Sequence, residues 1–209
     1  MPSIYDIKPR FQALLRPLVK QLAERGVSAN QVTVAAVIVS ILSGLCIALW
    51  PQAHWPLLAV PAVLFVRMAL NAIDGMLARE FNMKSRLGAV LNELGDVVSD
   101  ALLYLPFALI SGVPAALIVF IVVLAIVSEM TGVVSVQIGA TRRYDGPMGK
   151  SDRALVFGVL GLLLGLGVTP SLWLTAVLWG MLVLSALTIF NRARRALAEI
   201  GKDRVSTNI

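Results

Sequence analysis

The chain has 209 residues, of which 58% are hydrophobic and 14% are charged, and its mean hydropathy is +0.84. This composition is too apolar for an ordinary soluble domain and indicates an integral membrane protein. The net charge of +6 comes from basic residues placed beside the apolar segments, which argues against nucleic-acid binding. The single cysteine, Cys46, excludes an intrachain disulfide.

Residues 3–25 predict an amphipathic helix on the cytoplasmic membrane surface, with Lys20 and Arg25 away from its apolar face. The apolar positions share one helical face and are Phe11, Leu14, Leu15, Leu18 and Leu22. Pro17 predicts a kink or a division of this helix. No cleavable signal peptide is expected here, because the segment has no uninterrupted apolar core.

The rest of the chain predicts an all-α protein with six transmembrane helices, in a single membrane domain over residues 1–209. The expected spans are at about 31–50, 56–79, 88–110, 114–138, 154–168 and 170–190. Lysine and arginine flank only alternate ends of these spans, so the positive-inside rule predicts that both termini are cytoplasmic. Trp50, Trp55 and Trp173 then fall at the opposite interface.

Two charges lie inside the expected second and fourth spans. Arg67 is twelve residues from Arg79, and Glu129 is thirteen residues from Arg142, which places them at similar depth. We therefore expect a buried Arg67–Glu129 pair that holds two helices in register. The alternative is that Arg67, which shares a helical face with Asn71, binds a phosphate.

Acidic residues concentrate where the second span ends and the third begins. Five of the twelve acids lie here, namely Asp74, Glu80, Glu93, Asp96 and Asp100. Because a charge facing lipid costs about 2.5 to 3.5 kcal/mol, these polar faces must point inward. A short polar linker makes the two helices antiparallel neighbours, so their faces form a cytoplasmic pocket suited to Mg²⁺ or Mn²⁺.

The spacing of this stretch resembles the signature of the CDP-alcohol phosphatidyltransferases, Asp-x2-Asp-Gly-x2-Ala-Arg-x8-Gly-x3-Asp-x3-Asp. The matching positions are Asp74, Gly75, Ala78, Arg79, Gly88 and Asp96. Asn71 and Asn92 stand where the family has its first and third aspartates. The chain is therefore identified as a member of this family.

The resemblance implies transfer of a phosphatidyl group from CDP-diacylglycerol, or a similar CDP-alcohol, to an acceptor alcohol with release of CMP. It implies metal ligands at Asn71, Asp74, Asn92 and Asp96, with Asp96 also a candidate general base. The implied substrate-binding residues are Gly75 and Ala78, which allow close approach of the nucleotide, Arg79, which contacts its phosphates, and Gly88. Contact with membrane lipids and a homodimer are also implied.

The two asparagines halve the formal charge of the four motif positions, from −4 to −2. Either one metal site is then weakened or lost, or nearby acids assist. Asp100 lies one turn beyond Asp96 on the same face, so we expect it to be the assisting catalytic acid. Glu93 is rotated about 100° away.

A long polar loop, residues 142–153, lies on the same side as the acids. It lacks the glycine spacing of a Walker motif. Lys150 and Arg153 are candidates for gripping the lipid phosphate or a phosphorylated polyol such as glycerol 3-phosphate, while Arg142 and Arg143 are also explained by topology alone.

Three functions stay open. The first is an active transferase of this family. The second, motivated by Asn71 and Asn92, is a catalytically weakened relative that binds CDP-lipid or a partner protein. A transporter is the least favoured, because the acids lie mainly on one side and no inverted repeat is visible. The acceptor alcohol is not encoded in any motif of the chain.

Overall fold

The computed structural model describes residues 4–206, with side chains described for residues 10–201. Within this part every regular element is a helix, which confirms the all-α prediction. The elements are α1 (Ile4–Glu24), α2 (Ala29–Leu49), α3 (His54–Glu80), α4 (Arg86–Tyr104), the 3-10 helix η1 (Leu105–Leu109), α5 (Ala115–Gln137), α6 (Lys150–Gly165) and α7 (Leu172–Ser206).

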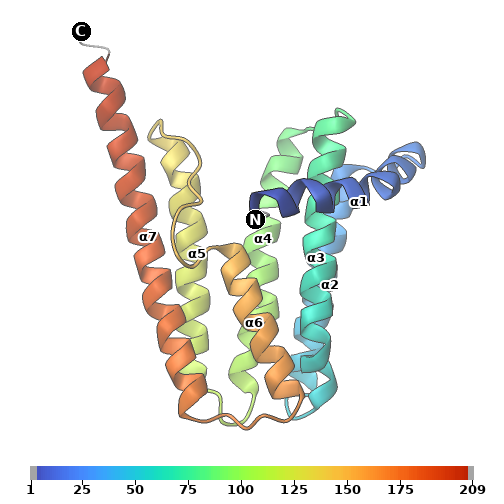
Figure 1. The fold of residues 1–209 in the computed structure, drawn as a ribbon, viewed down its shortest axis with the longest axis vertical. Coiled ribbons are helices and arrows are strands. Elements are labelled where there is room, and N and C mark those ends of the chain that lie inside the picture. The colour runs from blue at the N-terminus through green and yellow to red at the C-terminus, as the bar shows by residue number, and fades with distance from the viewer. Residues whose placement is uncertain (1–3, 207–209) are drawn as a thin grey trace.

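Helices α2 to α7 run up and down along one common direction, and α1 crosses one end of the bundle (Figure 1). The α3–α4 linker, the α5–α6 loop and the end of α7 lie at the same end as α1. The other connections lie at the opposite end. Helix α2 packs against both α3 and α4, α3 packs against α6, and α5 packs against α7. The α5–α6 loop descends into the bundle before α6 begins (Figure 1).

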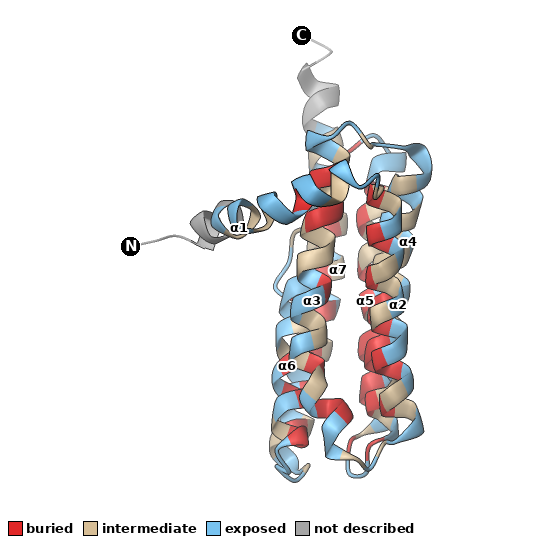
Figure 2. Cartoon of the chain, turned by 90° about the vertical axis from the view of Figure 1, so that its right-hand side faces the viewer, coloured by how far each residue is buried: buried red, intermediate tan, exposed pale blue. Residues whose placement is uncertain are grey.

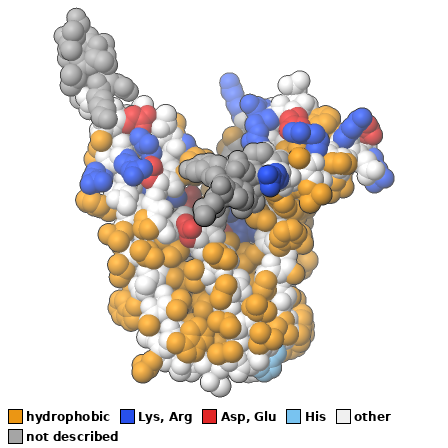
Figure 3. All heavy atoms as spheres, viewed as in Figure 1, with side chains coloured by type: hydrophobic (Ala, Val, Ile, Leu, Met, Phe, Trp, Pro, Cys, Tyr) orange, Lys and Arg blue, Asp and Glu red, His pale blue; other side chains and the backbone are white. Residues whose placement is uncertain are grey.

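Four helices are long and apolar enough to cross a membrane, namely α2, α3, α5 and the Leu172–Gly201 part of α7. Helix α6 has only 16 residues, and the 19 residues of α4 include Glu93, Asp96 and Asp100. A spanning role for α4 and α6 therefore stays a prediction. Hydrophobic side chains cover most of the visible face, and the charged side chains gather toward the end where α1 lies (Figure 3).

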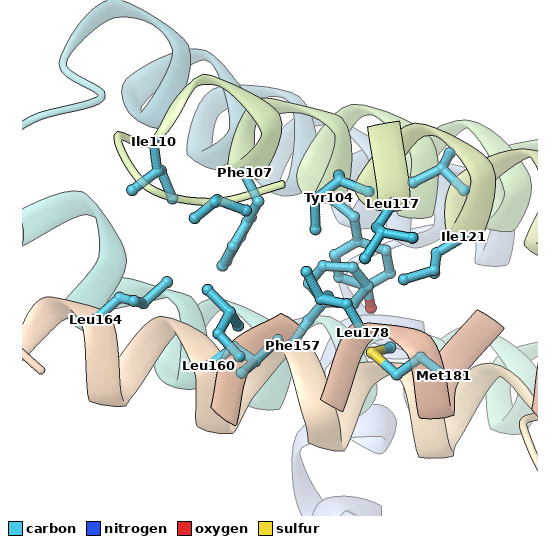
Figure 4. Close-up of a cluster of buried hydrophobic side chains, with 14 of the residues drawn as sticks. Tyr104, Phe107, Ile110, Leu117, Ile121, Phe157, Leu160, Leu164, Leu178 and Met181 are labelled. Atoms are coloured by element: carbon cyan, nitrogen blue, oxygen red, sulfur yellow. The ribbon is translucent and has the colours of Figure 1, made fainter. Parts of the chain in front are cut away.

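An aromatic cluster joins α4 and η1 to α6. The rings of Tyr104 and Phe157 stack with centroids 4.0 Å apart, and Phe107 meets Phe157 edge-on at 5.3 Å (Figure 4). The two aromatic pairs contribute about 0.5 to 1.5 kcal/mol each beyond the area they bury. Other buried side chains line the inward faces of the helices (Figure 2). The cluster fixes α6 against the end of α4.

Glycines set the close approach of α6 to α3. A Cβ atom added at Gly165 would lie 2.7 Å from the backbone nitrogen of Leu58, and one added at Gly161 would lie 2.9 Å from Cβ of Val60. Larger residues at these positions would push the helices apart. The start of α6, which carries Lys150 and Arg153, is therefore placed by helix packing.

Helix α1 is continuous through Pro17, so of the two alternatives the division is wrong and the kink stays a prediction. A proline removes only one backbone donor, and packing maintains the helix on both sides of it. Val19 is fully buried in a cluster that includes Ile73 and Leu77 of α3. Leu14 and Leu18 stay exposed. The location of α1 on a membrane surface stays a prediction.

Candidate functional site

The two polar faces predicted on α3 and α4 meet in the structure. The side-chain nitrogen of Asn71 donates to Oδ1 of Asp96 at 3.4 Å. A linker of only five residues, 81–85, joins the two helices. Since α2 packs against both, α3 and α4 face each other across a cavity beside the N-terminal end of α2.

Asp74 is buried and has a partner that the sequence reasoning missed. The hydroxyl of Thr33, on α2, donates to Oδ2 of Asp74 at 2.8 Å. Thr33 lies one turn after Ala29, whose carbonyl also accepts from this hydroxyl. A hydroxyl between the apolar residues Val32 and Val34 was the available signal. Thr33 fixes the orientation of the Asp74 carboxylate.

We call the space between α2, α3 and α4 the motif cavity. It has a volume of about 770 Å³. The predicted residues that line it are Asn71, Asp74, Gly75, Ala78, Arg79, Gly88 and Asn92. The guanidinium of Arg79 folds back over Gly75, where an added Cβ would lie 3.2 Å from it. The structure therefore brings most of the predicted site residues to one concave surface.

Ser28 caps α2, since its hydroxyl accepts from the backbone N–H of Gln31. Asn30 does not cap this helix but lines the motif cavity. A Cβ atom added at Gly88 would lie 2.7 Å from the side-chain oxygen of Asn30. Gly88 thus allows α4 to start close to α2.

A second space, the polar cavity, adjoins the motif cavity at Asn92 and has a volume of about 330 Å³. Its charged lining residues are Glu93, Asp96, Glu129, Arg142, Lys150, Asp152 and Arg192. The ammonium of Lys150 forms an ion pair with Oδ1 of Asp96. Lys150 therefore reaches the motif acid Asp96.

Arg153 does not reach either cavity, because its side chain is 1% exposed and enclosed by carboxylates. It lies 3.3 Å from Asp100 and 3.0 Å from Glu129. Arg67 lies 2.5 Å from the other oxygen of Asp100. The expected direct Arg67–Glu129 pair is wrong: Asp100 and Arg153 connect the two residues.

Asp100 was expected to assist the metal ligands. Both of its carboxylate oxygens instead accept from guanidinium groups, Oδ1 from Arg67 and Oδ2 from Arg153. The side chain lines neither the motif cavity nor the polar cavity. Its contacts join α3, α4 and α6, and they tie α6 to the helix that carries Asp96.

Glu129 forms ion pairs with three arginines and thereby connects α5 to the α5–α6 loop, α6 and α7. Its distances are 3.3 Å to Arg142, 3.0 Å to Arg153 and 3.3 Å to Arg192. Arg142 also pairs with Glu93 at 2.7 Å. Burial lowers the pKa of Arg142, but its hydrogen bonds with Glu93 and the charges of Glu93 and Glu129 raise this pKa above its ordinary value. Arg142, Arg192 and Glu93 are residues of the site that sequence reasoning gave no site role.

The motif side chains fit a hard divalent cation. Asp74 and Asp96 offer carboxylate oxygens, and Asn71 and Asn92 offer amide oxygens, which are the donors that Mg²⁺ and Mn²⁺ prefer. The formal charge of −2 balances one such ion. Among the described residues no group of three or more His, Cys, Asp or Glu side chains is placed to hold a metal. The four motif positions do not form such a group, because Asn71 and Asn92 stand where two acids would complete it.

An apolar groove between α3 and α6 reaches the same place. Its volume is about 500 Å³, and it runs along the helices from Asn71 and Lys150 to Leu162. Its walls are mainly Leu64, Phe65, Met68, Leu155 and Val159. The groove meets the motif cavity at Asn71 and the polar cavity at Lys150. Three differently lined spaces therefore converge on the motif side chains.

A profile of the CDP-alcohol phosphatidyltransferase family matches residues 27–190. The chain is 46% identical to the inner membrane protein YnbA of Escherichia coli, over 93% of this chain and 96% of that protein. It is 26% identical to a phosphatidylinositol phosphate synthase of Corynebacterium glutamicum, over 92% of this chain and 87% of that protein.

Solved structures with the same fold come from Mycobacterium tuberculosis. Its phosphatidylinositol phosphate synthase with CDP-DAG bound superposes with a TM-score of 0.73 at 20% identity, covering 86% of this chain and 92% of that one. The complex of that synthase with manganese and citrate gives a TM-score of 0.72 at 21% identity, covering 87% and 88%.

Proposed function

Because the chain belongs to the CDP-alcohol phosphatidyltransferase family, and is therefore a transferase, we propose that it moves a phosphatidyl group from CDP-diacylglycerol, or a similar CDP-alcohol, to an acceptor alcohol and releases CMP. One observation carries this proposal: the motif side chains lie where the motif cavity, the polar cavity and the apolar groove converge.

The donor takes the motif cavity and the apolar groove. Gly75 and Ala78 leave room for the nucleotide against α3, and Arg79 contacts its phosphates. The groove between α3 and α6 receives acyl chain, because its walls are aliphatic and aromatic and it opens beside Asn71. This arrangement keeps the hydrocarbon out of water while the pyrophosphate lies at the acids.

Asn71, Asp74, Asn92 and Asp96 hold the divalent cation that the family uses. When bound, Mg²⁺ or Mn²⁺ supplies positive charge to the phosphoryl oxygens and to the departing CMP. Thr33 orients Asp74 for this task through the hydrogen bond at 2.8 Å. The structure of a manganese complex of the mycobacterial synthase supports a divalent ion.

Asp96 takes the proton from the attacking hydroxyl of the acceptor. It borders the polar cavity, where the acceptor lies, and its contacts with Asn71 and Lys150 are both made by Oδ1. Oδ2 is then the oxygen that accepts the proton. Asp100 is a positioning residue in this scheme, because its guanidinium contacts tie α4 to α3 and α6.

The acceptor that we propose is a phosphorylated polyol, such as glycerol 3-phosphate or inositol phosphate. Two observations support it: Arg142, Lys150 and Arg192 border the polar cavity, and relatives of the chain are phosphatidylinositol phosphate synthases. Arg153, which the sequence suggested for phosphate binding, does not contact the acceptor, because Asp100 and Glu129 enclose it. An uncharged alcohol is the second candidate, because each bordering cation already has a carboxylate partner.

The same proposal places the protein in the cytoplasmic or inner membrane with six spans, as one domain. Helix α1, the end of α7, the α3–α4 linker and the α5–α6 loop lie at one end of the bundle (Figure 1), where charged side chains gather (Figure 3). This end becomes the cytoplasmic end under the positive-inside rule. The E. coli relative is an inner membrane protein. Accessibility of cysteines introduced into single loops tests this orientation.

Asn71 and Asn92 favour one alternative function, a weakened family member that binds CDP-lipid without turning it over. The test is CMP release by the purified chain with CDP-diacylglycerol and a panel of alcohols, with Mg²⁺, Mn²⁺ or chelator. We expect metal-dependent release with one acceptor class, lost in Asp96→Asn and kept in the control Glu24→Gln, an exposed acid on α1. CDP-diacylglycerol binding without CMP release from any acceptor would establish the alternative.

A further inference from the structure

We propose that this site binds a single divalent cation and that the ammonium group of Lys150, held on Asp96, supplies the positive charge of a second one. The inference rests on the proposed function in one respect only, namely that the motif side chains form a divalent-cation site. Three features of the described residues carry it: the charge of the four motif positions, the contacts of Asp96 and the anchoring of Lys150.

The charge count favours one ion. The four motif side chains carry a formal charge of −2, from Asp74 and Asp96, and the Lys150 ammonium on Asp96 reduces the local sum to −1. One divalent ion brings this sum to +1, and two would bring it to +3. Two divalent ions a few ångströms apart repel strongly unless carboxylates surround them. Arg79 borders the same cavity and adds to that repulsion.

The contacts of Asp96 show how Lys150 and Asn71 take the place of a second divalent cation. Oδ1 accepts from the amide of Asn71 at 3.4 Å and pairs with the ammonium of Lys150. An aspartate at position 71 would place a second carboxylate at this distance from Oδ1, and a cation would be needed between them. The asparagine removes that need by donating a hydrogen bond. The exchange of carboxylate for amide and the lysine contact are therefore parts of one arrangement.

The first turn of α6 places Lys150 beside Asp96, and hydrogen bonds hold this turn in position. It is the first residue of α6, whose start is fixed by the backbone N–H of Gly149 donating to Asp152 at 2.9 Å. One turn later the buried Arg153 donates to the carbonyl of Met148 at 3.2 Å and pairs with Asp100 on α4. Asp96 and Lys150 therefore belong to elements tied together by a buried ion pair. This distinguishes Lys150 from a mobile surface lysine.

The test counts bound ions and needs no turnover. Mn²⁺ is titrated into the purified full chain in detergent without substrate, and free Mn²⁺ is measured by electron paramagnetic resonance. We expect one Mn²⁺ per chain for the natural sequence. Lys150→Met should bind one Mn²⁺ about tenfold more tightly, because a repelling charge beside Asp96 is removed. The triple variant N71D/N92D/K150M should bind two.

Lys20→Met is the matched control, because Lys20 is an exposed lysine on α1 whose partner is Glu24. It should leave the number of ions and their affinity unchanged. Two or no Mn²⁺ ions per chain in the natural protein would overturn the inference, and so would unchanged Mn²⁺ affinity in Lys150→Met. The count on the natural protein tests the single-ion part of the inference even where a variant fails to fold.

The count is independent of the reaction. A chain that binds one Mn²⁺ but releases no CMP with any alcohol would keep this inference and reject the proposed transferase activity. A chain that releases CMP and binds two Mn²⁺ ions would do the reverse.

Discussion

Arg153 donates to Oδ2 of Asp100 at 3.3 Å, and this buried contact joins α6 to α4 one helical turn beyond Asp96. Asp100 also receives Arg67 from α3, so three helices meet at one carboxylate. Removing one partner from a buried ion pair leaves an uncompensated charge and destabilises a protein strongly. We therefore expect loss of this contact to lower the free energy of unfolding.

Asp100→Asn should lower the free energy of unfolding by about 3 kcal/mol, because two buried guanidinium groups lose their carboxylate. Denaturant or thermal unfolding in detergent measures this loss. The control Glu24→Gln removes an ion pair with Lys20 in which both side chains are exposed, and should cost less than about 1 kcal/mol. Equal losses in the two variants would show that Asp100 does not hold the helices together.

Thr33→Val should slow CMP release about tenfold and should also destabilise the fold. The variant keeps the shape of the side chain but removes the hydroxyl that donates to Asp74, leaving a buried carboxylate oxygen unsatisfied at a cost of about 1 to 3 kcal/mol. The control is Thr131→Val on α5, since that hydroxyl donates only to the carbonyl of Val127 in its own helix. A Thr33→Val enzyme as fast as the control would contradict the orienting role of Thr33.

Gly132→Ala should disturb the arginine side of the polar cavity. A Cβ atom at this position on α5 would overlap the guanidinium of Arg142 and would lie 2.6 Å from the carbonyl oxygen of Arg143. We expect the apparent KM for the acceptor to rise, and the protein to be destabilised by about 1 to 3 kcal/mol. Gly180→Ala on α7 is the control, because its added Cβ meets no atom within 4 Å. An unchanged KM would exclude Arg142 from acceptor binding.

Leu162→Trp should raise the KM for long-chain CDP-diacylglycerol and leave short-chain donors unaffected. Leu162 lies on the wall of the apolar groove at the end far from Lys150, where a larger ring occupies the space of an acyl chain. The control Leu166→Trp places the same ring on an exposed position outside the groove. Equal KM changes for long and short chains would place the acyl chains elsewhere.

Much of this arrangement could be predicted from spacing alone. The recurrence of Asn71 with Asp74, and of Asn92 with Asp96, predicted two polar helical faces, and the structure sets these faces opposite each other. Periodicity fixes which residues share a face of one helix. It does not fix the rotation of one helix about its axis relative to another.

The pairing of Arg67 shows the consequence. Counting from the ends of the spans placed Arg67 and Glu129 at similar depth, but α3 and α5 are separated there by Asp100 and Arg153. The contact of Thr33 with Asp74 escaped prediction for a related reason. It depends on how α2 packs against α3, and a hydroxyl near a helix start is explained equally well by its own backbone.

The separate linings of the motif cavity and the polar cavity, which share only Asn92 among the described residues, have a kinetic consequence for the proposed reaction. A donor in the motif cavity and an acceptor in the polar cavity meet at Asn92, so neither has to cross the binding space of the other. The architecture therefore imposes no obligatory order of addition. Initial-rate plots for donor and acceptor should intersect as in a random sequential mechanism, with both substrates bound before CMP departs.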